Sequence, residues 1–234
     1  MKTRTVIAGL AISLPLALPA PALAAGQSES AHHAAMTHES TGDNGAEHAE
    51  HRRMLAAAAH AEMAHIDSMQ VDVEVHDLEL HDQDDRRVRL ASDVIGNKLA
   101  AVTFVYSSCT TICPIYSALF TQIQDLLGDR LEREVVLITL TLDPTTDIPL
   151  RLKREARKYR AKPGWYYLTG AKTNVDQVLR GFDAYFPDFT QHPPMALVGD
   201  GATGTWKRYN GFPQPEQVVT MLDELRAARQ AQGG

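Results

Sequence analysis

Hydrophobic positions are unevenly distributed along this chain, and they predict a folded domain only from about residue 71 onward. Residues 100–106 and 135–142 are continuous apolar runs rich in β-branched side chains, which is typical of strands buried on both faces. Residues 165–168 form a shorter run of the same kind. Residues 71–75 alternate apolar and acidic side chains as an edge strand does, and residues 86–94 suggest a short strand before a turn at Gly96 and Asn97.

Helical periodicity fills the intervals between the predicted strands. After residue 111, apolar residues recur at spacings of three and four and predict one buried helix face that ends before Gly128: Ile112, Ile115, Leu119, Ile123 and Leu126. Further helices are expected over residues 150–159, 173–182 and 214–229. Residues 195–209 read as a hairpin, with Gly201 and Gly204 available for its turn.

The order of these elements predicts an α/β fold of the thioredoxin-like class. Strands that alternate with helices predict right-handed parallel crossovers, and the chain then closes with a hairpin and a helix. The strand and helix over residues 165–182 are a strand–helix piece inserted into that arrangement. We assign this domain to residues 71–230, a length sufficient for one hydrophobic core.

The first 24 residues have the pattern of a signal peptide. Lys2 and Arg4 precede an apolar run over residues 6–18, and small residues at 22–25 offer a cleavage site. We therefore expect a periplasmic protein with no stable membrane anchor after cleavage, the alternative being a retained anchor. Loss of Lys2 and Arg4 changes the net charge from −6 to −8, which gives the chain no electrostatic reason to bind nucleic acid.

Residues 25–70 form a His/Met-rich low-complexity segment without an aromatic residue. Such a segment cannot bury enough apolar surface to fold alone, although residues 46–69 can be helical because alanine and glutamate favour helices. Histidine and methionine both bind copper, so the segment either collects that metal or is a solvated linker.

The two cysteines of the chain, Cys109 and Cys113, lie four positions apart and are followed by Pro114. A disulfide that closes so small a loop removes little entropy from the unfolded chain, so chemistry is the better explanation. The pair lies where a buried strand passes into a helix, and unpaired N–H groups and the helix dipole there lower a thiol pKa. Thr110 or Thr111 is expected to cap this helix, with Pro114 in its first turn.

Sulfurs at positions i and i+4 can share one helix face, so the pair can close a disulfide or hold one metal ion. Two thiolates favour Cu(I) or zinc, and a third ligand would be needed. His192 is the single histidine after Asp82, in a loop expected to face the cysteines. The alternatives for the cysteines are a surface disulfide or a peroxiredoxin-like redox pair, and the alternative for His192 is an ordinary loop histidine.

Asp143 and Asp147 flank a turn after the second buried strand, and we interpret them as a turn followed by a helix cap.

Four features in order resemble the Sco/SenC family of copper-binding assembly factors for cytochrome c oxidase. They are the CxxxCP motif, the segment TLDPTTDIP, the lone downstream His192 and the glycine-broken hairpin before the last helix. The resemblance covers about residues 71–229. It implies a thioredoxin fold and one copper ion bound by Cys109, Cys113 and His192. The chain departs from many members at Gln191, where they carry an aspartate, and in lacking a predicted transmembrane anchor.

The resemblance implies a periplasmic copper chaperone rather than an enzyme. Its partner would be the copper-site subunit of cytochrome c oxidase or another periplasmic cuproprotein. The alternative is a thiol–disulfide oxidoreductase, in which Cys109 and Cys113 form a redox-active pair that reduces partner cysteines and is itself served by a thioredoxin-like reductant.

Overall fold

The computed structural model describes residues 66–232. The expected signal peptide and nearly all of the His/Met-rich segment lie outside the described residues. In the part of the chain that the structure describes, no helix is long and apolar enough to cross a membrane.

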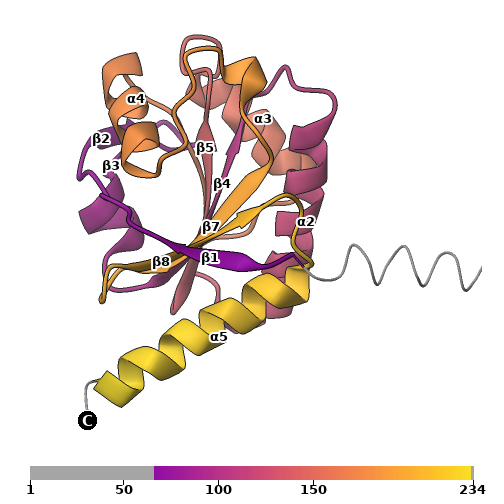
Figure 1. Ribbon diagram of the computed structural model, residues 1–234. Helices are drawn as coiled ribbons and strands as arrows, with labels where there is room; N and C mark the ends of the chain where they lie inside the picture. Colours follow the sequence, from indigo (N-terminus) through magenta and orange to yellow (C-terminus); the bar gives the residue numbers. More distant parts are fainter. Residues whose placement is uncertain (1–65, 233–234) are drawn as a thin grey trace, which may run out of the picture. The chain divides into compact units, whose positions relative to one another are not determined.

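A six-stranded mixed sheet forms the centre of the described domain (Figure 1). Its strands lie in the order β1-β8-β7-β4-β5-β6, in which β4, β5 and β6 are parallel and the other neighbours antiparallel. The strands are β1 (Ser68–Val71), β8 (Thr205–Asn210), β7 (Met195–Asp200), β4 (Leu99–Val105), β5 (Val135–Thr141) and β6 (Trp165–Leu168). A separate two-stranded sheet pairs β2 (Glu79–His81) with β3 (Arg87–Arg89).

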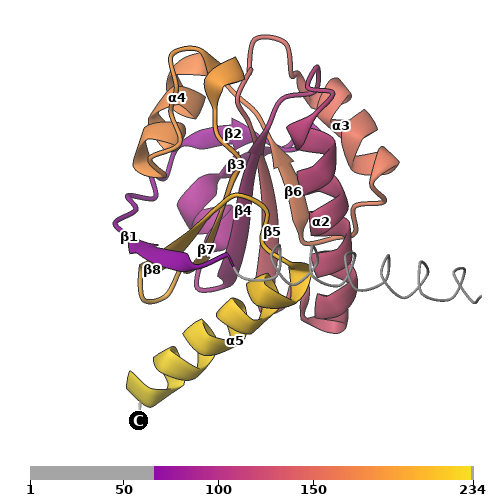
Figure 2. The same ribbon diagram turned by 45° about the vertical axis from the view of Figure 1, so that its right-hand side comes forward.

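Helices cover both faces of the central sheet, because alternate residues of its buried strands point to opposite sides. Leu99 and Ala101 of β4 face a core with α2 (Ile112–Leu127), α3 (Pro149–Lys158) and α5 (Pro215–Gln232). Ala100 and Val102 face a second core with α4 (Lys172–Gly181) and the π-helix Leu90–Ile95. Figure 2 shows α2 and α3 side by side beside the sheet. Two short 3₁₀ helices, Gly128–Arg130 and Phe189–Gln191, complete the fold.

The predicted α/β order is confirmed, and β6 with α4 is the expected insertion. The edge strand, however, was placed wrongly: it occupies Ser68–Val71 rather than residues 71–75, so Met69 lies in a strand and not at the end of a helix. There it pairs with Arg208 of β8, and this pairing outweighs the weaker helix preference of the preceding sequence.

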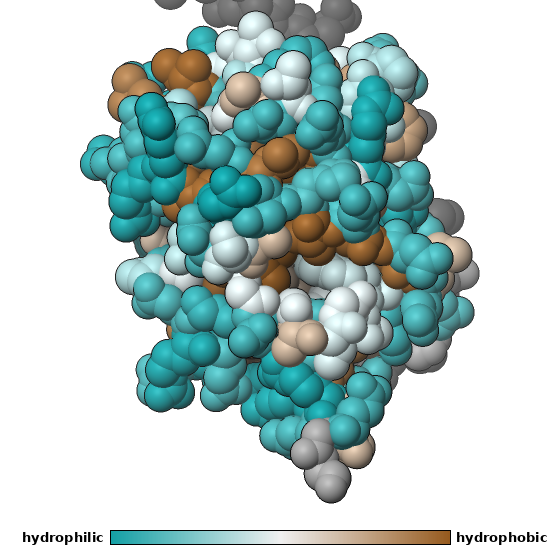
Figure 3. All heavy atoms as spheres, turned by 90° about the vertical axis from the view of Figure 1, so that its left-hand side faces the viewer, coloured by the Kyte–Doolittle hydropathy of each residue, from teal (hydrophilic) through white to brown (hydrophobic). Residues whose placement is uncertain are grey.

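The predicted buried face of α2 was also partly wrong. Ile115 and Leu126 are about half exposed, at 50% and 49%, whereas Tyr116, Phe120 and Ile123 are buried. The helix therefore turns its aromatic residues toward the sheet. Figure 3 shows the side of the molecule away from α2. This side is largely hydrophilic, and its hydrophobic side chains are visible mainly in a band across the middle.

The strand directions bring three chain segments to one edge of the sheet, the edge at which β4 and β5 end and β7 begins. The loop after β4 and the loop after β5 lie at the same edge because these strands are parallel. Strand β7 runs antiparallel to β4, and Thr103 lies opposite Ala196. The segment that precedes β7 therefore reaches that edge too, and it carries His192.

Candidate metal and thiol site

The two cysteines occupy the junction between β4 and α2. Helix α2 begins at Ile112, so Cys113 is its second residue and Pro114 its third, as the sequence predicted. Pro114 fits there because the first N–H groups of a helix have no partner inside it. The N-cap residue is Thr111, but neither its side chain nor that of Thr110 caps the helix, and this expectation was wrong.

The sulfur of Cys109 takes the position of the missing cap. The backbone N–H of Cys113 donates to Cys109 Sγ at 3.4 Å. A sulfur at a helix start lies in the positive field of the N–H groups, and negative charge on it is stabilised.

This position lowers the pKa of Cys109. Burial, the largest influence, raises it, but hydrogen bonds from the Cys113 side chain and from the backbone N–H groups of Cys113, Thr111 and Ile112 together outweigh burial. The resulting pKa is about 7, below the ordinary value of 9.0. A large fraction of Cys109 is therefore thiolate at neutral pH.

Cys113 has the opposite character. Its side chain is buried, and burial together with the neighbouring Cys109 sulfur raises its pKa to about 12. Both cysteines are free thiols. The pair thus consists of an accessible, acidic outer thiol and a buried thiol that keeps its proton.

His192 lies in the segment between the 3₁₀ turn Phe189–Gln191 and β7. Its ring packs at 5.4 Å from the ring of Phe104 and 5.3 Å from that of Phe186, measured between centroids. Burial in this apolar setting lowers the pKa of His192 to about 4, so the imidazole is neutral at physiological pH.

One nitrogen of that ring has no partner. Nε2 is buried and makes no hydrogen bond, which is costly for a polar atom. The backbone of Pro193 favours the protonated ring, but less than burial disfavours it. A neutral imidazole can present a lone pair to a metal ion, and the unpartnered Nε2 is available for this, as in metal-binding histidines.

One small cavity of about 60 Å³ has all three predicted site residues in its wall: Cys109, Cys113 and His192. Its other walls are mainly apolar and aromatic, including Phe104, Tyr116 and Pro194. The side chains are not yet gathered as a closed ligand set, however. Among residues 66–232, no three His, Cys, Asp or Glu side chains are placed to hold one ion together. For all three residues to hold one metal ion, their side chains would therefore have to move closer together.

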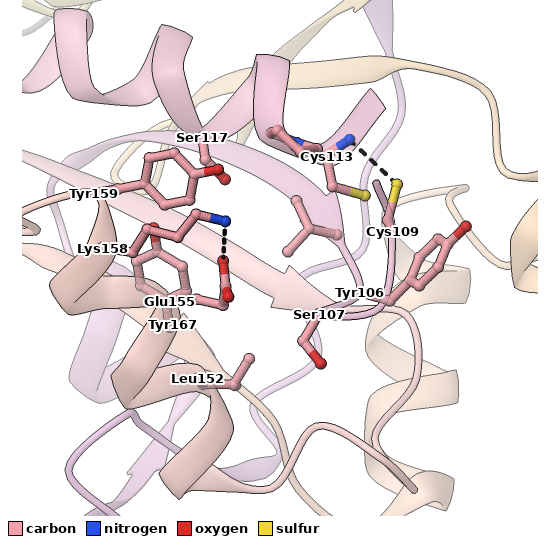
Figure 4. A pocket seen from close by; sticks show the side chains of 12 residues that line it. Tyr106, Ser107, Cys109, Cys113, Ser117, Leu152, Glu155, Lys158, Tyr159 and Tyr167 are labelled. Carbon is pink, nitrogen blue, oxygen red and sulfur yellow. Dashed lines mark hydrogen bonds and ion pairs between the residues drawn. The ribbon is translucent and has the colours of Figure 1, made fainter. Parts of the chain in front are cut away.

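A second small cavity opens on the other side of the cysteine pair (Figure 4). It lies between α2 and α3, and Cys109 and Cys113 line it together with Glu155 and Lys158, whose charged groups are 3.5 Å apart. The hydroxyl of Tyr167 is buried there without a partner. The cysteine pair therefore lines two small cavities.

Asp147 anchors the cysteine loop, a role that the sequence did not reveal. Its side chain is fully buried and accepts hydrogen bonds from the Ser107 N–H at 3.0 Å and from the Thr141 hydroxyl at 2.7 Å. The Ser107 hydroxyl also donates to it. Asp143 forms the expected turn, accepting from the Thr146 N–H at 3.2 Å, but Asp147 caps no helix, because the N-cap of α3 is Ile148 without a side-chain bond. In the sequence, Asp147 is marked only by its place in the segment DPTTDIP after a predicted strand.

Comparison with known proteins identifies similar chains. A model of the SCO1/SenC family matches residues 67–224. A relative named SCO1 protein homolog from Bacillus subtilis is 30% identical over 105 residues, which are 44% of this chain and 53% of the relative. The chain spans about half the length of the curated relatives it matches.

Solved structures show the same thioredoxin-like fold. BsSco, described as a member of the Sco family of cytochrome c oxidase assembly proteins with a disulfide switch, superposes with a TM-score of 0.56 at 24% identity; the match covers 67% of this chain and 95% of BsSco. A copper-bound ScoI from Bradyrhizobium japonicum gives a TM-score of 0.55 at 19% identity, covering 66% of this chain and 99% of that one. The predicted fold class is confirmed.

Replacing Asp147 tests its anchoring role. We expect Asp147→Ala to lower the free energy of unfolding by about 1–3 kcal/mol, because buried donors from Ser107 and Thr141 lose their acceptor. Urea denaturation measures this. The matched control is Ser107→Ala, which removes one donor and leaves the carboxylate bonded, so its effect should be smaller. Equal stability of Asp147→Ala and the wild type would contradict the role.

The pKa difference between the thiols predicts selective alkylation. With reduced protein, iodoacetamide should modify Cys109 with a rate that rises through a midpoint near pH 7, since only the thiolate reacts. Cys113 should stay largely unmodified at that pH. Mass spectrometry of the 109–113 peptide separates the two products. Cys109→Ser should lose the fast reaction, whereas a midpoint near 9 in the wild type would show that the helix start has no effect.

Proposed function

The chain belongs to the SCO1/SenC family. From that premise we propose that its domain is a copper carrier, in which Cys109, Cys113 and His192 together bind the copper ion. The cargo would pass to a cuproprotein such as the copper-site subunit of cytochrome c oxidase. The periplasmic location belongs to the same proposal and is supported by the signal-peptide pattern of residues 1–24. Copper is here the transported substrate rather than a permanent cofactor.

The observation that carries this proposal is the unpartnered Nε2 of His192 in the wall of the cavity that also contains both sulfurs. A buried ring nitrogen without a partner costs free energy, and a metal ion would satisfy it. The imidazole is already neutral, so no proton must leave before it binds.

The donor set suits Cu(I). Two thiolates and an imidazole are soft or borderline ligands, which this ion prefers over hard oxygen donors. Cys109 is ionised in large part at neutral pH, whereas Cys113 would lose its proton as the metal binds. Such a site leaves the metal open to a partner's thiolate, which favours transfer over permanent storage. The copper-bound relative from Bradyrhizobium japonicum supports the choice of metal.

Copper titration of the reduced protein tests this function. We expect one Cu(I) per chain in residues 66–232, measured by competition with a chromogenic chelator. Cys109→Ser, Cys113→Ser and His192→Ala should each weaken binding by at least about tenfold, since each removes one of three ligands. Ser107→Ala is the control, because it alters the same loop without removing a ligand. Full affinity in the double cysteine variant would end the proposal.

A second function, thiol–disulfide exchange with partner cysteines, is favoured by the unequal thiols. An acidic outer thiol beside a buried one that keeps its proton is the arrangement in which the outer sulfur attacks and the inner one resolves the mixed disulfide. BsSco, for which a disulfide switch is described, supports this alternative.

The reduction potential separates the two functions. In glutathione buffers, a reductase should show a dithiol–disulfide equilibrium with a strongly reducing potential. Cys109→Ser should abolish this equilibrium, because no disulfide can form, whereas His192→Ala should leave the potential unchanged. A copper carrier should instead lose copper in His192→Ala. Copper affinity that survives His192→Ala, together with a strongly reducing dithiol, would favour the exchange function.

A further inference from the structure

Helix α3, which borders the cysteine pair, is strongly cationic although the chain as a whole is acidic. Residues 151–162 contain seven lysines and arginines and one acidic residue, Glu155, whereas the whole chain has a net charge of −6. Leu152, Glu155 and Lys158 of this helix line the cavity shared with both cysteines (Figure 4). The cationic helix therefore borders the cysteine cavity, although its arginines lie outside the cavity wall.

Most of that charge is not neutralised inside the domain. The three lysines have acidic partners: Lys153 lies 2.9 Å from Asp84, Lys158 lies 3.5 Å from Glu155, and Lys162 lies 2.7 Å from Asp125. Within residues 66–232, the exposed guanidinium groups of the same segment form no ion pair or hydrogen bond, namely those of Arg151, Arg154, Arg157 and Arg160. These exposed groups can meet charge from outside, Arg157 while it also contributes to the lowered pKa of Asp84.

Exposed apolar side chains lie at the beginning of the same helix. Ile148 and Leu150 are 50% and 56% exposed, and they follow Asp147, which is bonded to the Ser107 N–H at 3.0 Å. Ile115, 50% exposed, lies two residues after Cys113. Apolar residues near a reactive centre, flanked by arginines, have the composition of a protein interface, in which arginine is enriched and lysine depleted.

We propose that Arg151, Arg154, Arg157 and Arg160, with Ile148 and Leu150, form a docking surface for a partner protein that carries acidic side chains around its own thiols. This inference depends on the proposed function in one respect, namely that the sulfurs react with, or pass copper to, a protein partner. Charge complementarity selects an acidic occupant, and the field of unpaired arginines would speed its arrival at Cys109. An anionic membrane would also attract arginines, but it offers no group for the adjacent thiols to react with.

Two synthetic peptides test the surface without copper. Each carries one cysteine as a 2-pyridyl disulfide, flanked by four glutamates in one peptide and by four lysines in the other. The Cys109 thiolate attacks the peptide sulfur, the S–S bond breaks, pyridine-2-thione leaves and a mixed disulfide forms. Because thione release is followed by absorbance, a failure of copper binding would not affect the result.

We expect the glutamate peptide to react about tenfold faster than the lysine peptide at low salt, and this preference to shrink at about 0.5 M salt. The variant Arg151→Glu/Arg154→Glu should remove or reverse it. The matched control is Arg133→Glu, an exposed arginine that precedes β5 and so lies at the opposite edge of the sheet from the cysteine loop.

Equal rates for the two peptides, or an unchanged preference in the double variant, would overturn the docking surface. Circular dichroism shows whether the variant is folded, and the salt dependence of the wild type tests the proposal without any substitution. Sedimentation with phosphatidylserine vesicles is the remaining measurement. Vesicle binding that depends on Arg151 and Arg154, without a peptide preference, would also overturn the proposal and assign the arginines to a membrane.

Discussion

The hydrogen bond from the Cys113 N–H to Cys109 Sγ is the interaction on which the chemistry of this protein depends. It sets the sulfur of Cys109 at the start of α2, where the unpaired N–H groups of the first turn stabilise a thiolate. The same geometry turns Cys113 inward, where burial keeps its proton in place. Two chemically identical side chains therefore differ in acidity because one precedes the helix and the other is part of it.

This helix start is held in place by groups from neighbouring strands. Asp147, from the loop after β5, binds the backbone of Ser107 in the loop after β4, and the parallel pairing of these strands brings the loops together. The antiparallel β7 brings His192 to the same edge of the sheet. Strand order thus determines which side chains meet, and a buried carboxylate fixes the conformation of the loop that carries the sulfurs.

The sequence predicted the elements whose patterns are long and local. Strands β4 and β5 are uninterrupted apolar runs, and Pro114 and Gly128 mark the ends of α2, so their positions were found closely. The edge strand β1 was misplaced because four residues with alternating polarity carry little signal. Ile115 and Leu126 fitted a helical spacing but are exposed, since Tyr116 and Phe120 fill the core instead. The spacing of the cysteines and the single late histidine pointed to three residues that line one cavity. The unequal burial of the thiols and the role of Asp147 arise only from packing between distant segments.

An outer thiol with a pKa of about 7 reacts with many disulfides and soft metals, so acidity alone gives no selectivity. Discrimination among partners must come from groups that leave the sulfurs unchanged. The arginines of α3 meet that requirement, because they are exposed and are not among the groups that chiefly set the pKa of Cys109. Reactivity is thus set by backbone N–H groups at the helix start, and under the proposed docking surface the choice of partner would be set by exposed charge. Because different residues carry these two properties, a change in the charge of α3 can alter which protein is met without altering what the thiols do once it arrives.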